Sequence, residues 1–346
     1  MRVNRICLLS SAILAAGNSL AVAAQWAPQA SIIIDNSQVL AGGVKRDLSS
    51  RALASVGLQM QHAAHQLVIS YQALRGNNGS DSVGDLQAYS NIDETGFSRL
   101  AEAYYRYDGG RWSVTLGKTD ANSDFAGPAA SGGFINSSMG FSPTIVTLPT
   151  YPKPALSVSA NIALNDSASF AVGTFAADGA SSFKEQFNIA ELRLRLNAAN
   201  RLSIGAWHDS NPVATNAGTT AARGIFATVD SVIPARDWLA GGIAVYGQLG
   251  YTEAEFSDIA WHLGGGMTMN ALLRGDDVLG AGISHIRLSE ARLRDAGNET
   301  ALELYYQWPI TNHMSLKPDL QLIIDPSGRR DIGDTLVFTL RLEAAL

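Results

Sequence analysis

Apolar and polar side chains alternate along most of this sequence, and the C-terminal segment 336–346 shows the pattern most clearly. Phe338, Leu340 and Leu342 share one face of a strand there, and Thr339 and Arg341 share the other, because successive side chains of a strand point in opposite directions. A tilted strand of about ten residues is long enough to cross a bilayer. The segment therefore predicts a membrane-crossing strand with an apolar outer face and a polar inner face.

The same alternation recurs along the chain and predicts about 16 strands, which gives an all-β fold. Links after odd-numbered strands are mostly long and polar, and we expect one of them to run from 208 to about 220. Links after even-numbered strands are mostly turns, at 62–65, 108–110, 165–166, 197–200, 234–237 and 309–313, with a longer one at 270–277. Outer-membrane barrels have short periplasmic turns and long extracellular loops. The pattern therefore predicts a transmembrane antiparallel β-barrel, and it disfavours a soluble periplasmic β-protein of similar composition.

The N-terminus has the pattern of a secretory signal peptide. Arg2 and Arg5 precede a short apolar run, and small residues follow near Ala23 and Ala24. We therefore divide the chain into a signal peptide, 1–24, and a single barrel domain, 25–346. The only cysteine, Cys7, falls in the signal segment, so the barrel requires no disulfide.

Charge and motifs argue against several classes of function. Removing Arg2 and Arg5 lowers the net charge from −6 to −8, which argues against nucleic acid as a partner. His62 and His65 lack nearby cysteines or paired carboxylates, so we expect no metal site. No Gly-x-Ser-x-Gly elbow or other recognisable nucleophile grouping occurs. We therefore expect neither an enzyme nor a cofactor, and a barrel enzyme is the less favoured alternative.

The alternation also predicts which charged residues face the lumen. An arginine facing lipid at mid-bilayer costs roughly 2–4 kcal/mol, so the strand that carries Glu191 must turn its arginines inward. Arg99 falls in the outward phase of its strand, so it lies above the membrane or a bulge resets the phase. The pore-lining or solute-contacting candidates are Arg99, Glu102, Tyr104, Arg106, Lys118, Asp120, Asp124, Glu191, Arg193, Arg195, Trp207, Glu303, Lys317 and Arg341.

Three blocks of sequence carry short motifs in a defined order. The first is Gly-Asp-Leu-Gln-Ala-Tyr-Ser-Asn-Ile at 84–92 with Arg-Leu-Ala-Glu at 99–102. The second is Leu-Gly-Lys-Thr-Asp-Ala-Asn-Ser-Asp-Phe at 116–125, with Gly-Phe-Ile-Asn-Ser-Ser at 133–138 and Tyr-Pro at 151–152. The third is Glu-Leu-Tyr-Tyr at 303–306, with Leu-Lys-Pro-Asp-Leu-Gln at 316–321 and Asp-Pro at 325–326. By their order and spacing, these three blocks resemble the carbohydrate-selective porins of the OprB type.

The resemblance implies a sixteen-stranded outer-membrane barrel that passes glucose-like monosaccharides passively into the periplasm. It further implies that the segment 120–152 folds into the lumen and narrows it, with Lys118, Asp120 and Asp124 at its entry. Small carbohydrates would be the transported solutes, outer-membrane lipid would surround the barrel, and the chain would form homo-oligomers, trimers by resemblance. One departure is Leu346 at the C-terminus, where such barrels commonly have an aromatic residue.

Sugar selectivity and a general pore remain two alternatives. Charged donors and acceptors that neutralise one another suit a neutral, hydroxyl-rich sugar, and Tyr104 and Trp207 could contact its apolar face. The inward arginines also suit a general or anion-tolerant porin with little sugar selectivity.

Overall fold

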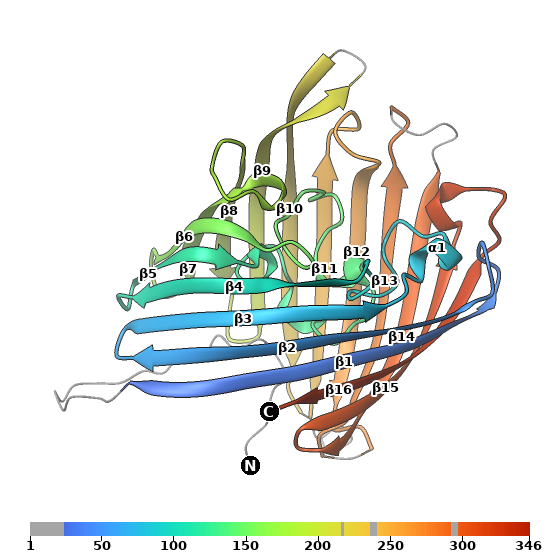
Figure 1. Ribbon diagram of the computed structural model, residues 1–346, viewed down its shortest axis with the longest axis horizontal. Coiled ribbons are helices and arrows are strands. Elements are labelled where there is room, and N and C mark those ends of the chain that lie inside the picture. Colours follow the sequence, from blue (N-terminus) through green and yellow to red (C-terminus); the bar gives the residue numbers. More distant parts are fainter. Residues whose placement is uncertain (1–23, 216–217, 236–240, 274, 292–296) are drawn as a thin grey trace.

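The computed structural model describes residues 24–346 except 216–217, 236–240, 274 and 292–296 (Figure 1). The expected signal segment lies outside the described residues, apart from Ala24. None of the described helices is long and apolar enough to cross a membrane.

Sixteen antiparallel strands follow one another around a closed barrel, and β1 closes it by pairing with β16 (Figure 1). The predicted all-β barrel of about 16 strands is confirmed. The strands are β1 (Gln25–Ala41), β2 (Leu48–His62), β3 (His65–Gly76), β4 (Phe97–Asp108), β5 (Trp112–Thr119), β6 (Ala155–Ala163), β7 (Ala168–Ala176), β8 (Gln186–Arg195), β9 (Asn200–Thr215), β10 (Gly218–Ile233), β11 (Ile243–Thr252), β12 (Ile259–Asn270), β13 (Val278–Leu288), β14 (Asn298–Thr311), β15 (Met314–Ile324) and β16 (Thr335–Ala345).

The final strand has the register that its sequence predicts. Val337, Thr339 and Arg341 of β16 are buried on the inner side, whereas Phe338 and Leu340 are partly exposed on the outer side. Exposed large apolar residues recur at alternate positions on most other strands. The outer surface is therefore apolar and the inner surface polar, as lipid outside and water inside require.

The strand β4 contains a β-bulge that explains the position of Arg99. Ser70 of β3 pairs with Glu102, whereas Gln72 pairs with Arg99, so Ala101 is the extra residue between them. A bulge of one residue reverses the facing of everything beyond it. Arg99 therefore shares the inner face with Glu102, which is one of the two alternatives that its phase left open.

The expected loop from 208 to about 220 is wrong, because most of it belongs to β9 and β10. Pro212 pairs with Ala221 and Ala214 with Thr219. The two strands therefore stay paired with each other past the point where their pairing with β8 and β11 ends. Figure 1 shows this hairpin rising above the rest of the barrel. A strand pair outside the membrane needs no lipid-facing side, so polar residues occur on both of its faces. Without the alternation of apolar and polar residues, such strands cannot be told from a loop in the sequence.

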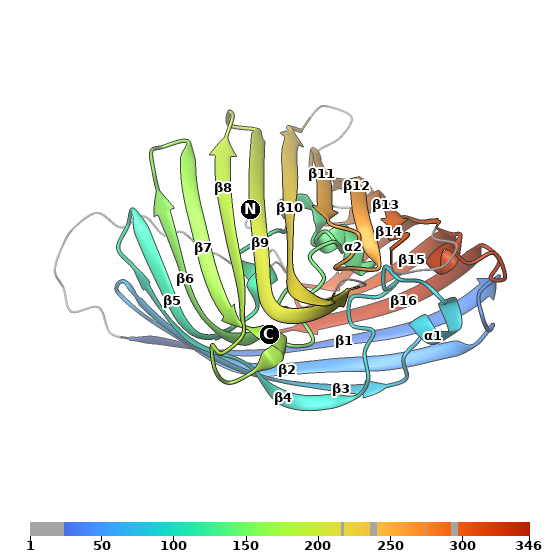
Figure 2. The same ribbon diagram turned by 90° about the horizontal axis from the view of Figure 1, so that it is seen from above.

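Two long links contain both α-helices that the structure describes. The link 77–96 carries α1 (Ser80–Val83), and the link 120–154 carries η1 (Ala121–Ser123), η2 (Ala129–Ser131) and α2 (Ser137–Gly140). A further short turn, η3 (Ala177–Gly179), follows β7, and η4 (Pro326–Gly328) follows β15. Figure 2 shows α2 within the ring of strands.

Candidate functional site

The link 120–154, named here the inner loop, is attached to the inner wall of the barrel by backbone hydrogen bonds to carboxylates. The amide of Ala126 donates to Glu191 of β8 at 2.8 Å. The amides of Ile135 and Asn136 donate to the two carboxylate oxygens of Glu303 of β14, at 2.6 and 3.0 Å. A loop whose amides bond to widely separated parts of the wall lies across the inside of the barrel.

Local capping explains why the inner loop turns where it does. The side chain of Asp120 accepts hydrogen bonds from the amides of Asn122 at 2.9 Å and Tyr151 at 3.0 Å, which joins the two ends of the loop. The side chain of Asn136 caps α2 by accepting from the amide of Ser138 at 3.0 Å. Asp and Asn are favoured at such positions because their short side chains reach the free backbone amides. Burial raises the pKa of Asp120, and these hydrogen bonds oppose the rise.

The link 77–96, named here the second loop, also lies inside the barrel, which the sequence did not reveal. The amides of Leu86 and Gln87 donate to the carboxylate of Glu299 at 2.9 and 3.1 Å. The second loop also contacts the inner loop, because the amide of Asn91 donates to the carbonyl of Ile135 at 2.7 Å. The two loops therefore support each other against β14 and its neighbours.

A cluster of four charged side chains lies where the inner loop begins. Arg106 of β4 donates to the carboxylate of Asp124 at 2.9 and 2.6 Å, and its Nε donates to Thr115 of β5 at 2.9 Å. Arg193 of β8 donates to Glu191 at 2.8 Å and also to the backbone carbonyl of Asp124. We call Arg106, Asp124, Glu191 and Arg193 the arginine–acid cluster.

The arginine–acid cluster is neutral overall and remains accessible to water. The side chains of Arg106, Asp124 and Arg193 are 27%, 30% and 33% exposed, respectively. Asp124 and Glu191 hold the two guanidinium groups in place. Because an arginine has five N–H donors, some of them remain available to a solute. The cluster can therefore offer several hydrogen bonds to a neutral polar molecule without attracting one sign of charge.

Aromatic rings flank both arginines of the cluster. The guanidinium of Arg106 lies 5.9 Å from the centre of the Tyr104 ring, and that of Arg193 lies 5.8 Å from the Phe125 ring. Tyr104 and Glu102 share the inner face of β4 with Arg106. Glu102 accepts a long hydrogen bond, 3.3 Å, from the amide of Asp120. The structure thus brings together Glu102, Tyr104 and Arg106 of β4, Glu191 and Arg193 of β8, and Asp120 and Asp124 at the entry of the inner loop.

Three other candidates face inward but are buried beneath the loops. Glu303, Lys317 and Arg341 are only 3%, 2% and 2% exposed. Lys317 donates to the carbonyl of Gly133 in the inner loop at 2.9 Å. Arg341 forms an ion pair with Asp35 at 2.7 Å and donates to Asn91 in the second loop at 2.9 Å. These residues hold the loops in place, so they do not line open space as the sequence predicted.

The remaining candidates occupy separate places. Trp207 faces inward but is 3% exposed, because its ring stacks on Phe187 at 5.9 Å within an apolar cluster. It therefore presents no surface to a sugar. Arg195 lies at the end of β8 and donates to the carbonyl of Asp166 in the adjoining turn. Arg99 lies 3.7 Å from the ring of Phe97 at the opposite end of β4.

Lys118 does not face the lumen. It pairs with Ala103 and with Leu156, and both partners belong to the outer face. Its amino group donates to the backbone carbonyl of Leu100 at 2.8 Å. The expectation of a pore-lining lysine overlooked the alternation of β5, which turns Lys118 to the same side as Leu116.

Sequence reasoning missed two members of this region, Thr115 and Phe125. Thr115 was recognisable as an inward residue of β5 by its phase alone, between Val114 and Leu116. Nothing in the pattern around Phe125 marks it, because its position depends on the path of the inner loop. Within the residues that the structure describes, no group of three or more His, Cys, Asp or Glu side chains is placed to hold a metal ion.

Comparison with known proteins identifies the family. Residues 68–346 match the family described as carbohydrate-selective porin, OprB family. The comparison with curated proteins gave no match.

Solved structures agree with this fold. OprB of Pseudomonas putida at high pH is 15% identical, with a TM-score of 0.79 over 93% of this chain and 94% of that one. The trimer form of OmpT from Vibrio cholerae is 11% identical, with a TM-score of 0.60 over 94% of this chain and 100% of that one. The channel DcaP of Acinetobacter baumannii is 12% identical, with a TM-score of 0.59 over 96% and 100%. Since the family match spans most of the sequence, this chain belongs to the OprB family of carbohydrate-selective porins.

Proposed function

We propose that this porin carries glucose-like monosaccharides passively through the outer membrane into the periplasm, without catalysis and without a cofactor. As an outer-membrane β-barrel of its family, the chain is a channel for small solutes. The observation that carries the proposal is the arginine–acid cluster, in which water-accessible guanidinium groups are paired with carboxylates beside Tyr104.

The chemistry of the cluster suits a sugar better than an ion. A monosaccharide is neutral, its hydroxyls both donate and accept, and one face of its ring is apolar. Arginine N–H groups and carboxylate oxygens complement the hydroxyls, and an aromatic ring complements the apolar face. Transport also requires that such binding stay weak enough for release, which partly solvated groups allow.

Uptake into liposomes tests the proposal. Purified protein is reconstituted, and the entry rates of glucose and gluconate, which have similar sizes, are compared. We expect glucose to enter faster. Equal rates would refute sugar selectivity, and the absence of uptake of either solute would refute the porin function itself.

The alternative function is a general or anion-tolerant diffusion pore. Arg106 and Arg193 favour it, because both are partly exposed cations inside the barrel. Their pairing with Asp124 and Glu191 is the argument against it, because the paired cluster has no net charge. Faster entry of gluconate than of glucose would support this alternative.

We also infer that copies of the chain associate with each other. The support is the fold shared with OmpT, whose solved structure is described as a trimer form. Native mass spectrometry of the detergent-solubilised protein measures the number of copies, and a strictly monomeric species would exclude the assembly.

A further inference from the structure

Arg75 and Lys118 are two cations on the outer face of the barrel. Arg75 follows Ile69 and Tyr71 in the outward phase of β3, and Lys118 follows Leu116 in the outward phase of β5. Each is the last residue but one of its strand, at the end that the parity of the links makes extracellular. The apolar outer face of both strands ends at these residues, so the head groups of the outer leaflet begin at their level.

No carboxylate balances these two charges on the outer face of β2 to β6. The strands β2, β3, β5 and β6 contain no Asp or Glu, and the carboxylates of β4 face inward or lie at its periplasmic end. Lys118 donates to the backbone carbonyl of Leu100 at 2.8 Å, and Arg75 bonds to backbone carbonyls through Nη1 alone. Two donors of the Lys118 ammonium and the Nε–Nη2 edge of the Arg75 guanidinium therefore remain for an anion.

A row of polar side chains continues this boundary across β7, β8 and β9. Thr174 pairs directly with Asn188, and Asn188 pairs directly with His208, on the outer face of the wall. None of these three side chains has a hydrogen-bond partner among the residues that the structure describes. Lipid tails cannot satisfy a hydroxyl, an amide or an imidazole, so the row belongs at the level of polar head groups.

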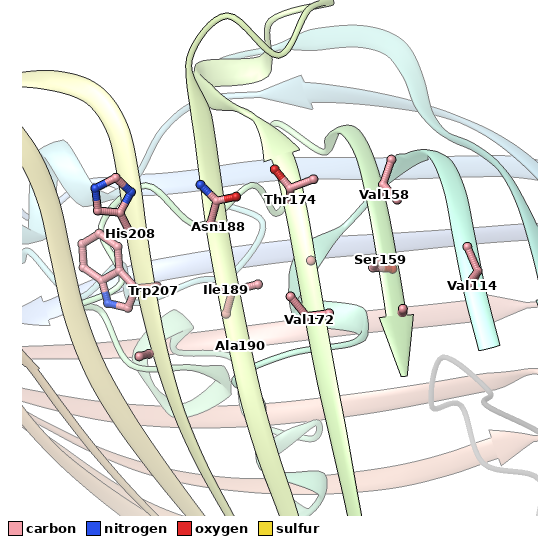
Figure 3. A pocket seen from close by; sticks show the side chains of 13 residues that line it. Val114, Val158, Ser159, Val172, Thr174, Asn188, Ile189, Ala190, Trp207 and His208 are labelled. Atoms are coloured by element: carbon pink, nitrogen blue, oxygen red, sulfur yellow. The ribbon is translucent and has the colours of Figure 1, made fainter. Parts of the chain in front are cut away.

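A recess borders the polar row on its periplasmic side (Figure 3). It has a volume of about 490 Å³, and the outward residues of one cross-strand row line it: Val114, Ala160, Val172, Ala190 and Ala206. Short apolar side chains in the middle of an outer wall leave a hollow. Val114 is four residues from Lys118 on β5, so the recess begins roughly 13 Å along the strand from that cation.

One kind of molecule combines the groups that these three features can bind. A glycolipid of the outer leaflet, such as lipopolysaccharide, has phosphates and hydroxyls in its head and acyl chains beneath them. Phosphate complements Lys118 and Arg75, hydroxyl and amide groups complement Asn188 and His208, and an acyl chain complements the apolar recess. A soluble anion would leave the recess unused, and a lipid without phosphate would leave the two cations unbalanced.

We propose that the outer face of β3 to β9 binds a phosphorylated glycolipid of the outer leaflet, with a phosphate on Arg75 and Lys118 and one acyl chain in the recess. The polar row bonds to the head group between them. The inference is independent of the solute that the pore carries and of the number of copies that associate.

Native mass spectrometry of the detergent-solubilised protein with lipid A, the phosphorylated anchor of lipopolysaccharide, tests the phosphate contact. We expect the wild type to bind lipid A at least roughly tenfold more tightly than the same lipid without its phosphates, and Arg75→Gln/Lys118→Gln to lose this preference. Arg46→Gln/Arg330→Gln is the matched control, because it removes two exposed cations from the links after β1 and β15 and should keep the preference. Equal binding of both lipids by the wild type, or an undiminished preference in Arg75→Gln/Lys118→Gln, would overturn the proposal.

A second pair of variants tests the recess. Ala190→Trp fills it, and we expect the affinity for lipid A to fall at least roughly tenfold. Leu320→Trp is the matched control, because Leu320 is an outward apolar residue, 39% exposed, on β15 at the far side of the barrel, and its affinity should be unchanged. The heat-dependent gel mobility of each variant shows that its barrel is folded, whatever solute it carries. Unchanged affinity in folded Ala190→Trp would overturn the proposal.

Competition identifies the source of the phosphate. An excess of inorganic phosphate should displace little lipid A, because the acyl chain contributes to binding. Displacement by inorganic phosphate as effective as that by unlabelled lipid A would assign the cations to free phosphate and overturn the proposal. Wild-type protein that excludes lipid A because a second copy covers the recess would overturn it as well.

Discussion

Changing the charge of the arginine–acid cluster should change which solutes the pore prefers. Two guanidinium groups and two carboxylates balance there, because Arg106 pairs with Asp124 and Arg193 pairs with Glu191. Asp124→Asn keeps the shape and leaves one excess positive charge. Arg106→Gln removes a cation and leaves one excess negative charge. The two variants should therefore shift the preference in opposite directions.

The size of the shift follows from Coulomb's law. A solute anion about 6 Å from one excess charge gains about 0.7 kcal/mol in water, and about 1.4 kcal/mol at an effective dielectric constant near 40. Salt at about 0.1 M roughly halves both values at this distance. The gluconate-to-glucose uptake ratio should therefore rise about two- to fourfold in Asp124→Asn and fall by a similar factor in Arg106→Gln.

Liposome uptake of both solutes in the same preparation measures this ratio. Asp331→Asn is the matched control, because its ion pair with Arg329, at 2.5 Å, lies in the exposed link after β15. The control makes the same change in net charge outside the lumen and should leave the ratio unchanged. If both cluster variants leave the ratio unchanged, or shift it in the same direction, the cluster is not the selective element.

Three further predictions concern the loops and the apolar packing. Glu303→Gln loses one of its two hydrogen bonds to the inner loop, so loop attachment should weaken by roughly 1–3 kcal/mol. Single-channel recordings should then show larger, noisier currents, and currents like those of the wild type would contradict the attachment. Trp207→Ala removes a large buried ring, so it should lower the free energy of unfolding in urea by roughly 3–5 kcal/mol and leave the preference for glucose over gluconate unchanged. A changed preference with an unchanged free energy of unfolding would instead make Trp207 a solute contact. Burial and the nearby Glu299 carboxylate raise the pKa of Asp85 well above its usual range. The protonated carboxyl is the form that suits the folded state, so Asp85 stabilises the fold more as pH falls and less as pH rises. In Asp85→Asn the second loop should therefore resist proteolysis at pH 8 at least as well as in the wild type, and faster cleavage would show that a charged Asp85 is needed.

The inward arginines show which properties of a residue the sequence pattern can predict and which it cannot. Alternation placed Arg106, Arg193 and Arg341 on the inner face, and the structure agrees for all three. The pattern cannot distinguish their exposure, which is 27% and 33% for the first two side chains and 3% for the third. Contact with a sugar stays a prediction for the exposed members.

The loops explain most of the differences between expectation and structure. The second loop covers Arg341, and the inner loop covers Glu303 and Lys317, through bonds between residues that are distant in the sequence. No local pattern encodes such pairs, because the loop amides that bond to wall carboxylates are present in every residue except proline. The bulge at Ala101 is not visible in the sequence pattern either, because one extra residue leaves the composition of β4 almost unchanged.

The barrel, the approximate number of its strands, the parity of its links and the facing of most side chains follow from the sequence alone. It could do so because lipid outside and water inside impose a two-residue period on every strand. Which inward charges meet each other, and which ones the loops cover, became visible only in the folded barrel. Those features depend on the path of the loops across the barrel and on the relative heights of neighbouring strands, and both arise only when the barrel closes.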